Sequence, residues 1–142
     1  MAAKIGKSKD GHLMHYSVGA IIERGGKYLM IDRAVLPYGF ACIAGHIETG
    51  EDPMTALARE VEEESGMKVQ GCEKILETEV DWNLCSRGIR VHYWHLFECV
   101  AEGDPVLFSA EEKSIGWYSP EELGKMKLEP IWEYWLKKRG II

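Results

Sequence analysis

Apolar and polar residues alternate along several short stretches of the chain, a pattern typical of β-strands with one buried face. The first two stretches flank the turn-forming residues 24–27, which predicts a β-hairpin. The loop predicted over residues 36–50 contains one proline and three glycines, with a short apolar piece at 40–44. The strands that the pattern predicts are 15–23, 28–33, 74–80, 89–100 and 114–118.

One predicted helix is marked at both ends. Asp52 is a favourable capping residue, and Pro53 suits the first turn, where no backbone N–H is required. Gly66 fits the position just past the end. Two further helices are predicted, one with capping-box spacing at 119–122 and one opened by Pro130. Apolar residues recur at helical spacing in the first helix at Met54, Leu57, Ala58 and Val61. This mixture of hairpin strands and helices predicts one α/β domain.

The composition narrows the possible classes of protein. The chain has 142 residues, of which 46% are hydrophobic and 28% charged, as in a globular domain. The net charge of −6 argues against general nucleic-acid binding, which depends on Lys and Arg. The sequence contains no run of about 18 apolar residues, so it predicts no membrane-spanning helix. The polar residues 1–12 are predicted to form a flexible N-terminal tail rather than a signal peptide.

The four cysteines indicate the cellular compartment. None belongs to a Cys-x-x-Cys pair, so neither a zinc knuckle nor a thioredoxin motif is predicted. Without a secretory signal, they are best interpreted as free thiols, and we expect a cytoplasmic protein.

Glutamates are concentrated in the predicted helix that follows Asp52. At about 100° per residue, Glu60, Glu63 and Glu64 share one face, whereas Glu62 lies on the other side. Like charges at this spacing destabilise a helix by a few tenths of a kcal/mol per pair, about 0.2–0.5. A divalent cation bound by oxygen ligands would remove this repulsion. The alternative is an acidic face that is simply solvated, as most charge runs are.

The residues around these glutamates form a longer motif. From Gly45 to Met67 the chain reads GHIETGEDPMTALAREVEEESGM, which resembles the Nudix box, G-x5-E-x7-R-E-U-x-E-E-x-G-U, where U is a bulky apolar residue. Ile43 and Ala44 stand where the family often has Pro-Gly, which we interpret as subfamily variation. The fixed places are filled by Gly45, Glu51, Arg59, Glu60, Glu63, Glu64 and Gly66.

The resemblance implies a fold and an activity. Residues 13–142 would form an α/β/α sandwich with a mixed β-sheet. The domain would use Mg²⁺ or Mn²⁺ to hydrolyse the diphosphate linkage of a nucleoside diphosphate joined to another moiety. The substrate would be a small nucleotide-type molecule, and a homodimer is left open. The implied metal ligands are Glu60, Glu63 and Glu64, and the carbonyl of Gly45 could face the metal. The Glu51–Arg59 pair would support them.

Other residues are weaker candidates. In related enzymes a glutamate from the loop before residue 117 often assists the metal or acts as general base. We favour Glu111 over Glu112 for this position, with Glu63 as a further candidate for the base. The alternative is an ordinary solvated loop. For substrate binding, arginine can hold phosphate and an aromatic ring can stack on a base. Trp94 could instead belong to the core. The candidate substrate-binding residues are Tyr38, Arg87, Arg90 and Trp94.

Two other functions remain as alternatives. The domain could be a catalytically inactive Nudix-fold module that binds nucleotides or regulates another process. The complete set of carboxylates argues against an inactive module, because a domain that has lost its catalytic activity no longer needs to retain them. An isomerase on the same fold would need a different acid–base pair, which the sequence does not identify.

Overall fold

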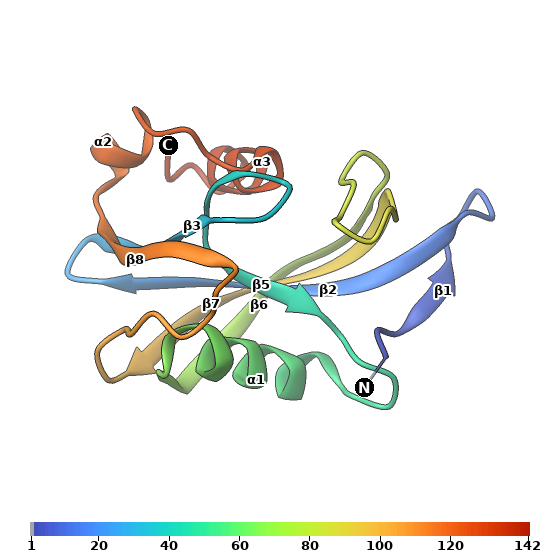
Figure 1. The fold of residues 1–142 in the computed structure, drawn as a ribbon, viewed down its shortest axis with the longest axis horizontal. Coiled ribbons are helices and arrows are strands. Elements are labelled where there is room, and N and C mark those ends of the chain that lie inside the picture. Colours follow the sequence, from blue (N-terminus) through green and yellow to red (C-terminus); the bar gives the residue numbers. More distant parts are fainter. Residues whose placement is uncertain (1) are drawn as a thin grey trace.

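The first long alternating segment becomes the central strand of a mixed β-sheet in the computed structural model, which describes residues 2–142 (Figure 1). The elements are β1 (Ile5–Lys7), β2 (Leu13–Arg24), β3 (Lys27–Arg33), β4 (Gly39–Ala41), β5 (Ile43–His46), α1 (Pro53–Ser65), β6 (Lys68–Val80), β7 (Val91–Glu102), β8 (Glu112–Tyr118), α2 (Pro120–Leu123) and α3 (Pro130–Lys138).

Strand β2 organises the sheet because four other strands pair with it. Its residues 14–22 run parallel to residues 91–99 of β7, and β6 continues the sheet beyond β7 in antiparallel pairing. Along its other edge β2 pairs antiparallel with β1, β5 and the start of β3. Strand β3 in turn pairs with β4 and β8. The sheet is therefore mixed, as predicted.

Helices cover both faces of the sheet, which confirms the α/β/α arrangement. Figure 1 shows α1 below the sheet and α2 and α3 above it. Helix α1 buries Leu57 and Val61, and α3 buries Trp132 and Trp135. Within residues 2–142, no helix is long and apolar enough to cross a membrane.

The structure differs from the sequence prediction in two short regions. The predicted loop contains β4 and β5, because β4 gains backbone partners on β3 and β5 gains them on β2. The predicted flexible tail contains β1, whose residues 5–7 pair with residues 13–15 of β2. Lys4 N also donates to Ile47 O at 2.8 Å. Met1, the first residue of that tail, lies outside the described residues.

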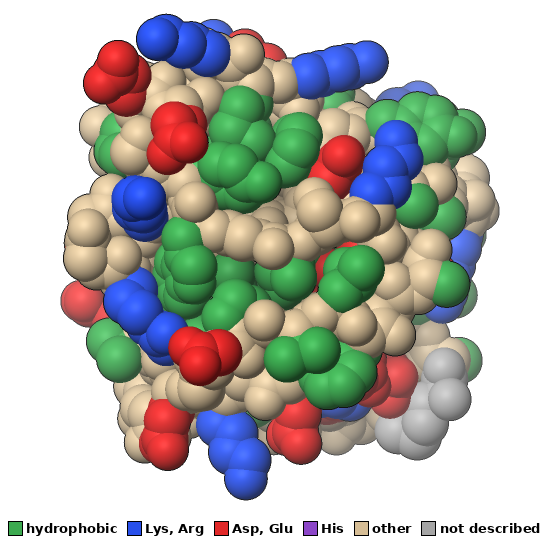
Figure 2. Space-filling model, turned by 60° about the vertical axis from the view of Figure 1, so that its left-hand side comes forward, with side chains coloured by type: hydrophobic (Ala, Val, Ile, Leu, Met, Phe, Trp, Pro, Cys, Tyr) green, Lys and Arg blue, Asp and Glu red, His purple; other side chains and the backbone are tan. Residues whose placement is uncertain are grey.

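The surface carries both signs of charge. On the face drawn in Figure 2, Lys and Arg side chains are interspersed with Asp and Glu around groups of hydrophobic side chains. This distribution agrees with the net charge of −6 and does not present a basic tract on that face.

Candidate active site

Helix α1 is fixed in place by its caps and by its apolar face. Asp52 Oδ1 accepts a hydrogen bond from Thr55 N at 2.8 Å, and Gly66 ends the helix in the left-handed conformation with φ of 72°. Burial of Leu57 and Val61 against the sheet leaves Glu60 and Glu64 at the edge of the core. Of the predicted acidic face, Glu60 and Glu64 line a cleft, whereas the Glu63 side chain is 57% exposed and does not line it.

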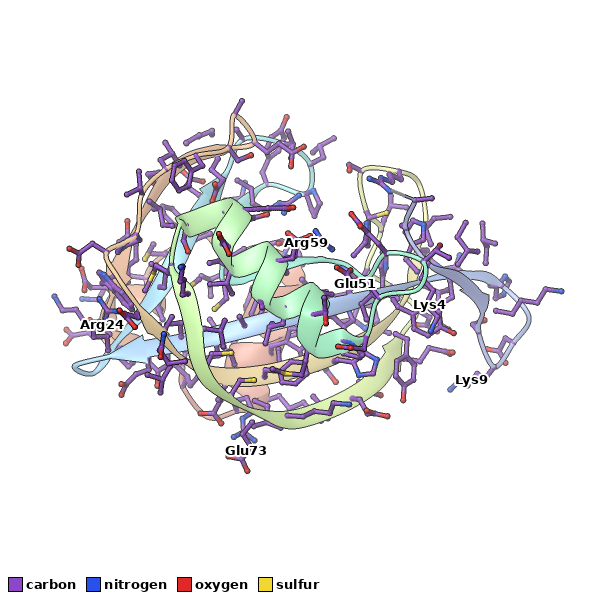
Figure 3. All side chains as sticks on the ribbon, turned by 90° about the horizontal axis from the view of Figure 1, so that it is seen from below. Lys4, Lys9, Arg24, Glu51, Arg59 and Glu73 are labelled. Carbon is purple, nitrogen blue, oxygen red and sulfur yellow. The ribbon has the colours of Figure 1, made fainter. Side chains whose placement is uncertain are left out.

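Arg59 connects the carboxylates of this helix to the loop before it. Its Nε and Nη2 atoms donate to the two oxygens of Glu51 at 2.7 and 2.9 Å, and Nη2 also donates to His46 O at 3.0 Å. Nη1 donates to Glu60 at 2.9 Å and to Glu63 at 3.2 Å. Figure 3 shows Arg59 and Glu51 together beside α1. The hydrogen bonds from Arg59 lower the pKa of Glu51, so this pair stays charged.

Gly45 allows the carboxyl group of Glu60 to lie directly against the backbone of β5. A Cβ atom at this position would overlap the Glu60 carboxyl group. Position 45 therefore requires glycine, because the Glu60 carboxyl group fills the space that a side chain at residue 45 would occupy.

Glu60 and Glu64 are half-buried on the same side of α1, without enough positive charge to balance both. Burial raises the pKa of Glu60 to about 7, against the opposing effect of Arg59. Burial and then the charge of Glu60 raise the pKa of Glu64 to about 9. Within the described part of the chain, Glu64 Oε2 is buried and has no hydrogen-bond partner. A hard cation would supply the missing partner, so these residues fit a divalent metal ion.

Glu111, in the loop before β8, and Glu112, the first residue of that strand, carry two more carboxyl groups. Glu111 is exposed and lines the cleft, whereas Glu112 is buried. Neither carboxyl oxygen of Glu112 has a hydrogen-bond partner among residues 2–142. Burial, and then Glu111, raise the pKa of Glu112 to about 7. After burial and the charge of Glu60, the charge of Glu112 also contributes to the raised pKa of Glu64.

The cleft has a volume of about 270 Å³ and joins the acidic helix to the loop 83–87. Its wall combines acidic, basic and imidazole side chains, the composition expected of a site for a polar, charged ligand. The charged and imidazole lining residues are Arg33, His46, Glu48, Glu60, Glu64, Arg87, His92, Glu111 and Glu129.

The predicted substrate-binding residues are not gathered in one place. Arg87 lines the cleft, but Tyr38 and Arg90 are exposed on the surface. Trp94 lines the floor of the cleft with only 4% of its surface exposed. Its ring packs edge-on against Trp132 and Trp135 of α3, at centroid distances of 6.0 and 5.9 Å. The face expected to stack on a base is thus covered, because α3 closes this side of the sheet.

The sequence analysis missed several cleft residues. Arg33 donates to Pro37 O at 2.7 Å and lies 3.8 Å from the buried Glu129. Burial raises the pKa of Glu129 to about 7, with Arg33 opposing the shift.

His46 and His92 face each other in the cleft wall, with 3.4 Å between their Nε2 atoms. Burial lowers their pKa values to about 3 and about 4, so both rings are neutral near pH 7. His46 and His92 come together only because β5 and β7 both pair with β2.

Comparisons with known proteins identify a family and relatives for this chain. A family model described as the NUDIX domain matches residues 13–138. Nucleoside triphosphatase NudI of Escherichia coli O139:H28 is 28% identical over 138 residues, which cover 86% of this chain and 94% of that protein.

Solved structures show the same fold. The NUDIX hydrolase from Nitrosomonas europaea superposes with a TM-score of 0.73 at 20% identity, covering 89% of this chain and 88% of that one. The NUDIX domain of Shewanella oneidensis NrtR, solved with ADP ribose, has a TM-score of 0.75 at 13% identity and covers 94% and 91% of the two chains.

Proposed function

The chain belongs to the NUDIX family of hydrolases, and from this premise we propose that it is a divalent-metal-dependent nucleotide pyrophosphohydrolase. It would act on the diphosphate linkage of a nucleoside diphosphate joined to another moiety. A cytoplasmic location is part of the proposal, because the four cysteines are free in the part of the chain that the structure covers.

The observation that carries this proposal is the buried oxygen of Glu64, which lies beside Glu60 without a partner in residues 2–142. Glu60, Glu63 and Glu64, with the backbone carbonyl of Gly45, would hold Mg²⁺ or Mn²⁺. Such an ion, when bound, would neutralise phosphate oxygens and favour attack at phosphorus.

Other residues would position the carboxylates, accept a proton and contact the phosphates. Arg59, held by Glu51, braces Glu60 and Glu63 at 2.9 and 3.2 Å. Glu111 is exposed to the cleft and would accept the proton of the attacking water. In this reaction the water oxygen bonds to phosphorus as the bridging P–O bond breaks. Arg87 would contact the phosphates, since guanidinium groups bind them through paired hydrogen bonds.

We propose nucleoside triphosphates as the first substrate class to test. The support is the similarity to nucleoside triphosphatase NudI, which extends over most of both chains. Cleavage between the α and β phosphorus atoms would release a nucleoside monophosphate and pyrophosphate. Sugar nucleotides and dinucleotide cofactors share the diphosphate linkage and form the comparison panel.

A substrate screen with product analysis tests this function. The purified chain with Mg²⁺ or Mn²⁺ would be incubated with each nucleotide class, and the phosphorus-containing products identified. We expect nucleoside monophosphate and pyrophosphate from triphosphates, and little turnover by E64Q. Tight nucleotide binding with no turnover of any class would instead favour the inactive binding module.

A further inference from the structure

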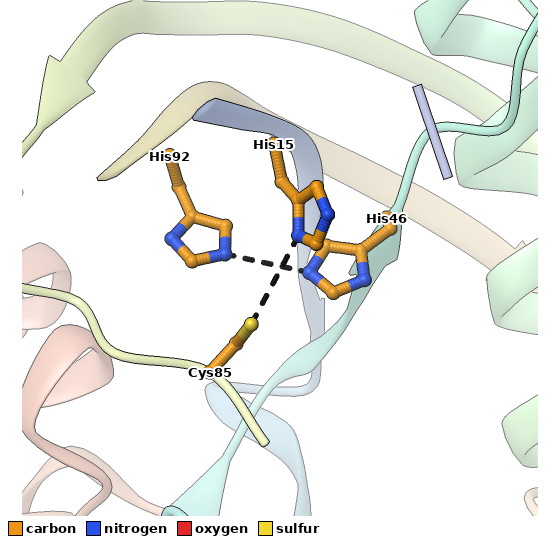
Figure 4. Close-up of side chains that lie close together, drawn as sticks. All are labelled: His15, His46, Cys85 and His92. Atoms are coloured by element: carbon orange, nitrogen blue, oxygen red, sulfur yellow. Dashed lines mark hydrogen bonds between the residues drawn. The ribbon is translucent and has the colours of Figure 1, made fainter. Parts of the chain in front are cut away.

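Three histidines and a cysteine from four separate segments converge at one end of the sheet (Figure 4). His15 on β2 and His92 on β7 are direct partners in the parallel pairing. His46, at the end of β5, pairs with Ser17, so it shares a face with His15. Cys85 reaches the same point from the loop between β6 and β7. The sheet itself therefore aligns the three imidazoles.

The distances between the four side chains suit a small ion. One nitrogen or sulfur atom from each residue lies within 4.8 Å of all the others. His46 Nε2 and His92 Nε2 are 3.4 Å apart, and Cys85 Sγ lies 3.9 Å from His15 Nδ1. Tetrahedral Zn²⁺ bonds of about 2.0 Å to nitrogen and about 2.3 Å to sulfur give ligand separations of about 3.3–3.6 Å. A pair at the limit of 4.8 Å would need to approach by about 1.2–1.5 Å.

We propose that these four side chains form a zinc-type metal site separate from the carboxylates of α1. Three imidazoles and one thiolate form a nitrogen and sulfur donor set, which selects borderline or soft ions such as Zn²⁺ over Mg²⁺. Glu60 and Glu64, by contrast, offer only oxygen and suit a hard ion. The two sites would thus take different metals although His46, Cys85 and His92 line the same cleft as Glu60 and Glu64.

The donor set indicates a structural role for this second metal. Four protein ligands complete a tetrahedral site and leave no open position for a substrate or water. Cys85 belongs to a short turn in which Cys85 N donates to Ile89 O at 2.9 Å and Gly88 N donates to Cys85 O at 3.0 Å. A metal bound to Cys85 would therefore fasten this turn to the three strands below it.

Fastening the turn would also shape the proposed active site. The residues 83–87 form one wall of the cleft that contains Glu60 and Glu64. On the other side, the backbone carbonyl of His46 accepts a hydrogen bond from Arg59 at 3.0 Å. The zinc-type site is thus connected both to the loop above the cleft and to the arginine that braces the carboxylates.

Cobalt spectroscopy tests this proposal without relying on hydrolysis. Metal-free protein would be titrated with Co²⁺ in excess Mg²⁺, which occupies the oxygen ligands. We expect a thiolate-to-cobalt charge-transfer band and strong visible bands typical of tetrahedral cobalt, saturating at one ion per chain. Added Zn²⁺ should abolish both signals, because the filled d shell of zinc gives no such transitions.

Two cysteine variants complete the test. C85S should lose the charge-transfer band, while C72S should keep it, because Cys72 lies on β6 outside the cluster. H15A should weaken cobalt binding independently of the sulfur ligand. Absence of the charge-transfer band in the wild type, or an unchanged band in C85S, would overturn the proposal. Melting curves of the metal-free proteins establish that each variant is folded, and none of these results depends on the hydrolase activity.

Discussion

Replacing Glu64 with glutamine should abolish turnover and at the same time stabilise the metal-free fold. Burial and the charge of Glu60 raise the pKa of Glu64 to about 9, from an ordinary value of 4.5. Between these pH values the folded protein retains a proton that the unfolded chain has released. The free energy of unfolding of the metal-free wild type must therefore fall as pH rises through this window.

The size of the effect follows from the same shift. Each pH unit inside the window lowers the free energy of unfolding of the metal-free wild type by about 1.4 kcal/mol. From pH 4.5 to pH 7 the decrease due to Glu64 is therefore at most about 3 kcal/mol. Glutamine has nearly the same shape and carries no charge at any pH. We expect the stability gained by E64Q to be close to zero near pH 4.5 and to increase up to about pH 9.

Denaturant unfolding in excess chelator at several pH values measures this difference, and kcat is measured with Mg²⁺. Adding Mg²⁺ should stabilise the wild type more than E64Q, because the variant has lost a charged ligand. E62Q is the matched control, since Glu62 is exposed on the same helix, and it should change neither the pH slope nor kcat. If E64Q were less stable than the wild type by the same amount at every pH, or retained full kcat, the reasoning would be wrong.

Excess chelator should abolish hydrolysis and added Mg²⁺ should restore it; full turnover in chelator would exclude the proposed metal requirement. E111Q should reduce kcat by about 10²–10⁴-fold, the usual contribution of a general base, with a much smaller effect from E112Q. Equal small effects of the two variants on kcat would leave Glu63 as the candidate base. W94A should lower the free energy of unfolding by about 3–5 kcal/mol, as expected for a buried tryptophan, and unchanged denaturant unfolding would show that Trp94 is not a core residue.

The parts of the structure that the sequence predicted depend on local signals. Helix α1 has a capping aspartate, an apolar face at helical spacing and a terminal glycine, all within residues 52–66. The hairpin of β2 and β3 has a Gly25-Gly26 turn between two alternating segments. Helical spacing was enough to group the glutamates of the acidic face, whereas the supporting role of Arg59 came from the resemblance to the Nudix box.

The parts that the sequence did not predict depend on pairing between strands rather than on a periodicity within one segment. Strands β1 and β5 have three and four residues, too few for a clear alternation, and they exist because β2 offers them an edge. The sequence left Trp94 either as a base-stacking residue or as a core residue and could not show that α3 covers it. The cluster of His15 and His92 requires the register between two strands 77 residues apart.

The parallel pairing of β2 with β7 also governs the order in which the protein assembles as it is synthesised. The edge of β2 that pairs with β1, β3 and β5 has its partners once residue 46 leaves the ribosome, but the other edge stays open until residues 91–99 follow. During that interval an apolar strand presents unpaired backbone groups to other chains. Since α1 also becomes available before β7, it shields one face of β2 but not its edge, and aggregation during synthesis is most favoured in this interval.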